Sequence, residues 1–232
     1  MISLTIIVPT YQEAENIGLV LAGLKEVLAS LDTVKSSILI VDDSPDDKTK
    51  DATLAAAGQL KPLSIQYLRR QRRGLATAVI DGVNIADTEY ILVMDGDLSH
   101  PPSIIAKMIQ YLAGHDLIIG SRLLPGGMVE QWPRHRYLMS RFATKLAVYL
   151  TQHVSDPLSG LFLIRKAAVD WQSLRPLGYK ILLEILVRHP ELKIKEIPYT
   201  FTNRQAGTSK INWLISWQYL RHWHRLWLAK KK

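Results

Sequence analysis

Short apolar runs alternate with longer segments of helical periodicity through the first 120 residues of the chain. The β-branched runs at residues 4–8, 38–41 and 90–94 predict strands, whereas residues 14–30 carry apolar side chains at helical spacing. Strands that alternate with helices in this way form βαβ units and a parallel sheet. Runs that are apolar throughout are typical of strands buried on both faces. The sequence therefore predicts an α/β fold whose ligands bind at the carboxyl ends of the strands.

The alternation ends near residue 120, and the rest of the chain is less regular. Pro9 is expected to stop the first strand. We predict one α/β domain over residues 1–207 and a basic, Trp-rich amphipathic helix over residues 208–232. The remaining predicted strands are 63–68, 116–120, 161–164 and 192–198, and the remaining helices are 49–57, 75–85, 101–112, 136–152, 179–189 and one from about 209.

Composition excludes several classes of protein. The 232 residues include no cysteine, so a disulfide scaffold, a thiolate zinc site and a cysteine nucleophile are ruled out. No apolar run approaches the ~20 residues that span a bilayer. The first lysine is Lys25, so we expect no signal peptide and a cytoplasmic location. The net charge is +8, and residues 208–232 are basic without any acid. This charge points to nucleic acid, a phosphorylated substrate or an acidic membrane surface.

Two carboxylates follow the predicted strand at 90–94. Asp95 and Asp97 are two residues apart, so both can face one hard cation. Carboxylates with few other protein ligands suit Mg²⁺ or Mn²⁺ completed by substrate phosphates. An Asp-Gly sequence is also common in plain turns, which is the alternative. The position after a buried strand favours a metal site.

Polar residues also follow the first two strands. Pro9, Tyr11 and Glu13 can face a base and ribose, although Glu13 is also placed to begin a helix. Asp42 and Asp43 can accept hydrogen bonds from a nucleobase edge or a ribose hydroxyl. The sequence alone favours the helix start for Glu13 and leaves the two aspartates open.

An arginine-rich segment precedes the third helix. Residues 69–73 hold four arginines, and Gly74 opens the helix. This pattern is typical of a loop that handles phosphate, with a solvated basic turn as the alternative. A nucleic-acid surface is disfavoured because no aromatic residues are interleaved.

Five further segments complete an ordered set of motifs: 95–102 (DGDLSHPP), 120–123 (GSRL), 155–160 (SDPLSG), 178–184 (GYKILLE) and 204–210 (RQAGTSK). The set, spread over roughly 200 residues, resembles the family-2 glycosyltransferases with the GT-A fold. Within that family it is most similar to dolichyl- and polyprenyl-phosphate mannosyltransferases. The resemblance implies a Rossmann-like, mostly parallel central sheet flanked by helices, with a C-terminal amphipathic helix.

The resemblance also implies roles for individual residues. Asp95 and Asp97 would hold Mg²⁺ or Mn²⁺ against the donor diphosphate. The family often has Gln as a further metal ligand where Ser99 stands, so that ligand is left open to water. The nucleotide-sugar site would include Pro9, Tyr11, Glu13, Asp42, Asp43, Gly74 and Asp95, the acceptor phosphate site Arg122, Arg136, Arg204, Ser209 and Lys210, and the catalytic set Asp97, Arg122 and Arg204.

The implied activity is an inverting transfer of mannose from GDP-mannose to a polyprenyl phosphate. A phosphate monoester has a second pKa of ~6, so this acceptor needs no general base. The alternatives are a glucosyl or other transferase that uses a UDP-sugar, a nucleotidyltransferase that releases pyrophosphate, and a non-catalytic membrane or nucleic-acid binding module. The expected partners are the donor, the lipid acceptor and a membrane surface, without nucleic acid.

The C-terminal segment concentrates tryptophan and positive charge. It holds four of the six tryptophans, and Arg221 and Arg225 lie on one face. Tryptophan and basic residues favour the membrane interface. The segment therefore predicts either an interfacial helix or a terminal helix packed on the core. If the helix is interfacial, the protein is expected to be peripheral on the cytoplasmic membrane face, and a separate membrane protein is a conceivable partner.

Overall fold

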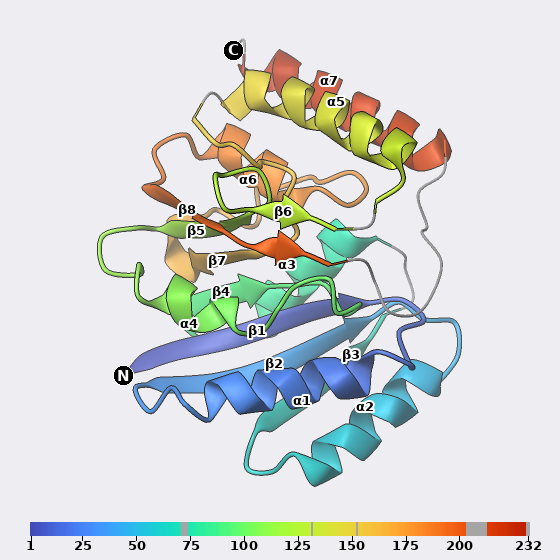
Figure 1. The fold of residues 1–232 in the computed structure, drawn as a ribbon, viewed down its shortest axis with the longest axis vertical. Coiled ribbons are helices and arrows are strands. Elements are labelled where there is room, and N and C mark those ends of the chain that lie inside the picture. Colours follow the sequence, from blue (N-terminus) through green and yellow to red (C-terminus); the bar gives the residue numbers. More distant parts are fainter. Residues whose placement is uncertain (71–73, 131, 152, 203–212, 231–232) are drawn as a thin grey trace.

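The computed structural model describes residues 1–70, 74–130, 132–151, 153–202 and 213–230 (Figure 1). The described strands are β1 (Ile2–Thr10), β2 (Val34–Asp42), β3 (Ser64–Arg69), β4 (Tyr90–Val93), β5 (Leu117–Ser121), β6 (Met128–Val129), β7 (Phe162–Arg165), β8 (Ile194–Pro198) and β9 (Thr200–Phe201). The described α-helices are α1 (Ile17–Leu28), α2 (Lys48–Gln59), α3 (Leu75–Ile85), α4 (Ile104–Ile109), α5 (Arg134–Thr151), α6 (Ile181–Arg188) and α7 (Trp213–Lys230).

A seven-stranded sheet in the order β3-β2-β1-β4-β7-β5-β8 runs through the centre of the molecule (Figure 1). All of its neighbouring strands are parallel except β7, which is antiparallel to both β4 and β5. The prediction of a mostly parallel α/β sheet is confirmed. β6 and β9 form a separate parallel pair. The sequence does not predict this pair, because two-residue strands carry no periodicity.

Pro9 lies inside β1, so the prediction that it stops the strand is wrong. The carbonyl of Ile7 accepts a hydrogen bond from Met94 N–H, at 3.2 Å, on the β4 side of the strand. Two residues later, the main-chain nitrogen of Pro9 faces the same side. Ile7 is the last residue of β1 that pairs with β4, so Pro9 lies beyond the paired region. The N–H that proline lacks therefore has no strand partner to lose, and β1 continues alongside β2 to Thr10.

Two apolar layers cover the faces of the sheet. The first includes α1, and its predicted stripe of Ile17, Val20, Leu21, Leu24 and Leu28 is buried there together with residues of α4. The second includes α3 and α6. With helices on both faces, the central strands are apolar on both sides and the sheet fixes the strand ends where ligands bind.

A third apolar cluster joins α5, α6 and α7. α5 and α7 lie side by side at one end of the molecule (Figure 1). Leu226 of α7 is fully buried among Ala147, Leu150 and Leu183, and Trp223 Nε1 donates to the carbonyl of Leu146 at 2.7 Å. The terminal helix is therefore packed on the core along one face. The predicted boundary between residues 207 and 208 lies outside the described residues and stays a prediction.

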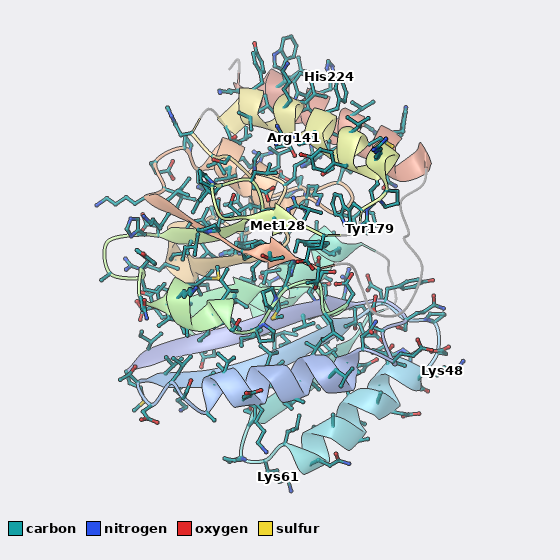
Figure 2. The ribbon with its side chains drawn as sticks, in the orientation of Figure 1. Lys48, Lys61, Met128, Arg141, Tyr179 and His224 are labelled. Carbon is teal, nitrogen blue, oxygen red and sulfur yellow. The ribbon has the colours of Figure 1, made fainter. Side chains whose placement is uncertain are left out.

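The other face of α7 is exposed. Trp217, Leu220, Arg221, His224 and Leu228 lie on it, and Figure 2 shows His224 at the outer edge of the molecule. Arg225, four residues from Arg221, is half-buried whereas Arg221 is exposed. It turns inward, where its guanidinium donates to the carbonyl of Arg175 and lies 3.5 Å from the carboxylate of Glu184. Within the described ranges, none of the helices combines the length and hydropathy that a membrane-spanning segment requires.

Candidate functional site

The carboxyl ends of β1, β2 and β4 meet at one edge of the sheet. A Cβ built on Gly96, just past β4, would lie 3.0 Å from Cγ2 of Thr10 at the end of β1. The N–H of Asp43, just past β2, donates to the carbonyl of Thr10 at 3.0 Å. The sequence motifs that follow these three strands are therefore neighbours in space, as the fold rule for parallel sheets predicts.

Asp42 and Asp43 have different surroundings. The carboxylate of Asp42 is fully buried and accepts hydrogen bonds from Thr10, Ser44 and Tyr67 at 2.7–2.8 Å. Oδ2 of Asp43 accepts the Gly74 N–H at 2.9 Å, whereas Oδ1 has no hydrogen-bond donor among the described residues and lies 3.5 Å from Nη1 of Arg70. Burial raises the pKa of Asp43. Asp42 thus stabilises the ends of the strands, and Asp43 is the better candidate for contact with a nucleoside.

The segment after β1 has a structural role as well. The carbonyl of Glu13 accepts the N–H groups of Asn16 and Ile17, and its side chain accepts the Asn16 amide at 2.8 Å. These bonds agree with the interpretation of Glu13 as the start of α1. Pro9 is buried at the end of β1, and Tyr11 is half-buried at the same edge. Their contact with a nucleotide stays a prediction.

The two described arginines of the 69–73 segment are held by carboxylates. Arg70 Nε lies 2.9 Å from Asp81 and its Nη1 lies 3.5 Å from Asp43, and Arg69 pairs with Asp47. Gly74 precedes α3 with a φ of 148°, a backbone conformation that favours glycine. The segment therefore fixes the start of α3 against β2. Residues 71–73, with the other two arginines, lie outside the described residues.

Asp95 and Asp97 form an acidic pair past β4. Asp97 is buried and its Oδ1 accepts the Ser99 N–H at 3.1 Å, while the side chain of Asp95 is 30% exposed. Burial raises the pKa of Asp95, and the nearby charge of Asp97 acts in the same direction. A bound cation would relieve this electrostatic penalty.

The donor set at this pair fits a hard divalent cation. Carboxylate oxygens are ligands that Mg²⁺ and Mn²⁺ favour. Among the described residues, no cluster of three or more His, Cys, Asp or Glu side chains is placed to hold a metal. A cation held by this pair would complete its coordination with water and substrate phosphate oxygens.

Arg122, which follows β5, is fixed by Asp156. Its Nε and Nη2 each donate to one carboxylate oxygen at 2.7 Å, and its main-chain N–H adds a bond of 3.1 Å. Burial favours the neutral form of Asp156, yet the bonds from Arg122 hold its pKa below the ordinary value. The carboxylate of Glu196 accepts the main-chain N–H groups of Ser155 and Asp156. The role of Asp156 is thus to orient Arg122.

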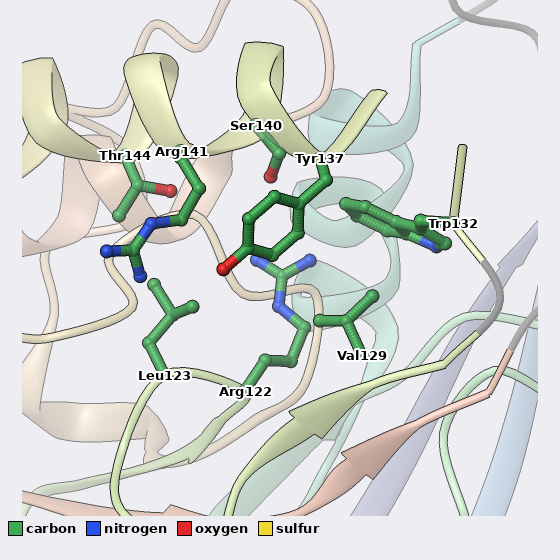
Figure 3. Close-up of a pocket in the computed structure, with 8 residues that line it drawn as sticks. All are labelled: Arg122, Leu123, Val129, Trp132, Tyr137, Ser140, Arg141 and Thr144. Carbon is green, nitrogen blue, oxygen red and sulfur yellow. The ribbon is translucent and has the colours of Figure 1, made fainter. Parts of the chain in front are cut away.

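A small, solvent-open hollow lies next to Arg122 and is called the pocket below (Figure 3). Side chains of α5 enter it from one side, and Arg122 and Leu123 enter from the opposite side. Arg136 stacks its guanidinium over the Trp132 ring at 4.1 Å. The lining residues are Arg122, Leu123, Val129, Trp132, Tyr137, Ser140, Arg141 and Thr144. The pocket therefore combines the guanidinium groups of Arg122 and Arg141 with aromatic and aliphatic side chains.

Lys180, directly before α6, belongs to the same electrostatic environment. Its ammonium donates to the carbonyl of Leu158 at 2.8 Å. Burial lowers the pKa of Lys180 to about 8, with Arg122 acting in the same direction and Asp95 and Asp156 opposing it. Lys180 was not among the predicted site residues, although it lies within the 178–184 motif.

The structure brings together most of the predicted site residues that it describes. Asp95, Asp97 and Arg122 share one site, and Arg136 lies beside Trp132 near the pocket. Arg204, Ser209 and Lys210 lie outside the described residues. The pocket residues Trp132, Tyr137 and Arg141 were missed because only tertiary packing sets α5 against the segment after β5.

The fold has close counterparts among solved structures. Glucosyl-3-phosphoglycerate synthase from Mycobacterium tuberculosis, in complex with Mn²⁺, UDP-glucose and phosphoglyceric acid, aligns with a TM-score of 0.72 and 16% identity. The alignment covers 99% of this chain and 79% of that one. Another structure of the same enzyme aligns with a TM-score of 0.69 and 17% identity, over 99% of this chain and 80% of that one. The predicted GT-A fold is confirmed.

Sequence relatives carry the assignment further. The dolichol-phosphate mannosyltransferase of Pyrococcus furiosus is 37% identical over 227 residues, which is 96% of this chain and 63% of the relative. The enzyme of the same name from Saccharomyces cerevisiae is 34% identical, over 99% of this chain and 88% of the relative. The undecaprenyl-phosphate mannosyltransferase of Micrococcus luteus is 30% identical, over 89% of this chain and 86% of the relative. Residues 5–171 match the family model for glycosyl transferase family 2, and the chain therefore belongs to that family.

Proposed function

We propose that the chain transfers mannose, with inversion, from GDP-mannose to the phosphate of a polyprenyl phosphate at a membrane surface. The placement of Arg122 is the observation that carries this proposal. Asp156 orients its guanidinium, which lies in the electrostatic environment of Asp95 and also lines the pocket beside α5. A fixed guanidinium next to apolar walls suits an acceptor that joins a phosphate to a hydrocarbon chain.

The relatives support the sugar and the acceptor more than the nucleotide. Dolichol-phosphate and undecaprenyl-phosphate mannosyltransferases are named for mannose and for a polyprenyl phosphate. GDP follows from the resemblance of the motifs alone, so a UDP-sugar donor is the first alternative. Membership of a glycosyltransferase family favours an enzyme over the alternative of a binding module.

The donor would occupy the edge formed by β1, β2 and β4. Asp43 would accept a hydrogen bond from the nucleoside through Oδ1, the oxygen that lies 3.5 Å from Nη1 of Arg70. Asp95 and Asp97 would hold Mg²⁺ or Mn²⁺, which neutralises the charge that develops on the departing diphosphate. Pro9 and Tyr11 would line the same part of the site, and Gly74 fixes the position of Asp43 through its N–H.

The reaction requires no general base. An oxygen of the lipid phosphate attacks C1 of mannose, the bond from C1 to the diphosphate oxygen breaks, and its electron pair leaves with GDP. Attack from the side opposite the leaving group inverts C1. The acceptor phosphate is largely dianionic at pH 7, so no proton has to be removed. Arg122 and Arg136 would hold the attacking phosphate, together with Arg204, Ser209 and Lys210.

Exposed apolar side chains on α5 and α7 support a membrane surface as the working location. Leu138, Phe142 and Tyr149 share an exposed face of α5 with Arg141 and Lys145. Phe142 is 65% exposed, and Trp217 of α7 is 53% exposed. Apolar and aromatic side chains interleaved with basic ones are typical of helices that lie in the headgroup region of an anionic membrane. The hydrocarbon chain of the acceptor would lie in the same membrane, with its phosphate at the headgroups.

The test is a matrix of donors and acceptors. Purified full chain is incubated with Mg²⁺ or Mn²⁺ and radiolabelled GDP-mannose, GDP-glucose, UDP-glucose or UDP-N-acetylglucosamine. Polyprenyl phosphate in detergent, the matching polyprenol and a soluble mannoside serve as acceptors. We expect label in the organic phase only with GDP-mannose and polyprenyl phosphate. Transfer from a UDP-sugar would correct the donor, and transfer to the polyprenol or the mannoside would overturn the acceptor.

A further inference from the structure

His100 is a buried imidazole beside Asp95 that the proposed reaction does not use. Its side chain is only 1% exposed. Nδ1 lies 3.0 Å from the main-chain nitrogen of Asp95, and Nε2 lies 3.7 Å from Oδ2 of the same residue. One ring therefore faces both the main chain and the side chain of the residue that we propose as a metal ligand.

The hydrogen bond identifies the tautomer of the neutral ring. The Asp95 N–H can only donate, so Nδ1 of His100 must be the unprotonated acceptor. The proton of the neutral imidazole is then on Nε2, on the side of the Asp95 carboxylate. Nδ1 thus accepts a hydrogen bond from the main chain of Asp95, and the Nε2–H group faces the carboxylate of the same residue.

The surroundings prevent the ring from turning. Tyr199 and Phe201 meet His100 edge to face, with ring centroids at 5.6 and 5.7 Å and interplanar angles of 73° and 75°. Gly160 lies close to the ring as well: a Cβ there would lie 3.2 Å from Cε1 of His100 and 3.0 Å from Oδ2 of Asp95. The packing therefore confines both the imidazole and the carboxylate.

We propose that His100 is a positioning residue that fixes the Asp95 carboxylate for a divalent cation, with Gly160 providing the space that this orientation needs. The inference rests on the proposed function, because it takes Asp95 as a metal ligand. Partners that orient a metal-binding group commonly change metal affinity by 10–100-fold when they are removed. His100 itself contributes no ligand in this account.

Two substitutions test the roles of the two ring nitrogens of His100 one at a time. His100→Asn places a carboxamide oxygen where Nδ1 accepts the Asp95 N–H but has no donor at the Nε2 position. His100→Gln reaches the Nε2 position with an amide donor but loses the Nδ1 acceptor. Binding of Mn²⁺ to the full chain with GDP is measured from the electron paramagnetic resonance signal of free Mn²⁺, without turnover. Thermal unfolding is recorded for each variant, and the exposed His153→Gln serves as the matched control.

We expect His100→Asn to unfold near the wild-type temperature and to bind Mn²⁺ 10–100-fold more weakly. His100→Gln should recover part of the Mn²⁺ affinity while unfolding at a lower temperature, and His153→Gln should match the wild type. Unchanged Mn²⁺ affinity in His100→Asn would overturn the proposal. So would losses of affinity that only follow the loss of thermal stability in both variants.

A second variant keeps the test decisive if the His100 variants do not fold. Gly160→Ala leaves the imidazole intact and crowds Oδ2 of Asp95, so it should also weaken Mn²⁺ binding. Wild-type Mn²⁺ affinity in Gly160→Ala would count against the proposal. If the wild-type chain transfers mannose and binds Mn²⁺ but the variants match it, only the role of His100 fails. If the wild type binds no Mn²⁺ with any nucleotide, the metal site of the proposed function fails with it.

Discussion

The carboxylate of Asp156 accepts two parallel hydrogen bonds of 2.7 Å from the guanidinium of Arg122, and both side chains are buried. The pair joins the segment after β5 to the loop that precedes β7. It leaves part of the Arg122 guanidinium directed to the pocket of Figure 3. An arginine held in this way presents a fixed positive charge, which a flexible lysine would not.

Arg122→Lys should lower kcat/KM for the lipid phosphate by about 10²-fold, since lysine cannot bridge both oxygens of Asp156. Asp156→Ala should destabilise the fold by roughly 3–5 kcal/mol, because it leaves a buried guanidinium without its counter-charge. Steady-state kinetics and chemical unfolding measure the two effects. Arg165→Lys is the control, because the ion pairs of this arginine are long, at 3.9 Å, and exposed. Wild-type kinetics in Arg122→Lys would contradict the assigned role.

Asp97→Asn should reduce transfer by at least about 10²-fold, because a neutral amide holds a divalent cation less well than a carboxylate. Calorimetric titration with donor in the presence and absence of Mn²⁺ should show that the metal-dependent part of the affinity is lost. The exposed Asp87→Asn should behave as wild type. Equal donor affinity with and without Mn²⁺ in the wild-type chain would exclude the metal site at the acid pair.

Lys180 should make the affinity for the acceptor depend on pH. Burial lowers the pKa of this ammonium to about 8. The positive charge is therefore present below that pH and is lost above it, so KM for the anionic acceptor should rise as the pH passes 8. Lys180→Arg keeps the charge and should abolish the rise, whereas Lys180→Met should give a high KM at every pH. If KM of Lys180→Met equals that of the wild type at every pH from 7 to 9, the ammonium does not act on the acceptor.

The two faces of α7 should respond differently to substitution. Leu226→Ala in the buried face should cost about 2–5 kcal/mol of stability, since it opens a cavity among α5, α6 and α7. Leu220→Ala in the exposed face should leave the unfolding temperature almost unchanged. Equal losses in the two variants would mean that α7 is not packed as the structure describes.

The membrane surface is tested with the exposed aromatic residues. Phe142→Ser together with Trp217→Ser removes two side chains that each contribute about 1.5–3 kcal/mol when buried in an apolar phase. Co-sedimentation with vesicles that contain anionic lipid should therefore fall by more than about tenfold, without loss of thermal stability. Undiminished sedimentation would assign these exposed faces to something other than a bilayer.

The sequence predicted the sheet and the acid pair because both depend on local patterns. Apolar runs gave the strands, and a motif directly after β4 placed Asp95 and Asp97 at the correct edge. The roles of Asp42 and Asp156 were not predictable, because hydrogen bonds from distant segments decide them. Pro9 was misjudged because the sequence does not show which side of β1 lacks a neighbour. The terminal helix was left between two interpretations, and one face supports each of them.

The linkage in the product tests the central claim most directly, because the claim is that the phosphate of the lipid is the nucleophile. Product made from GDP-mannose and polyprenyl phosphate is isolated and examined by ³¹P and ¹H nuclear magnetic resonance. The account predicts a phosphodiester in which C1 of mannose is joined to the lipid phosphate with the anomeric configuration inverted relative to the donor. A phosphomonoester, with mannose attached elsewhere, or a retained configuration would contradict it.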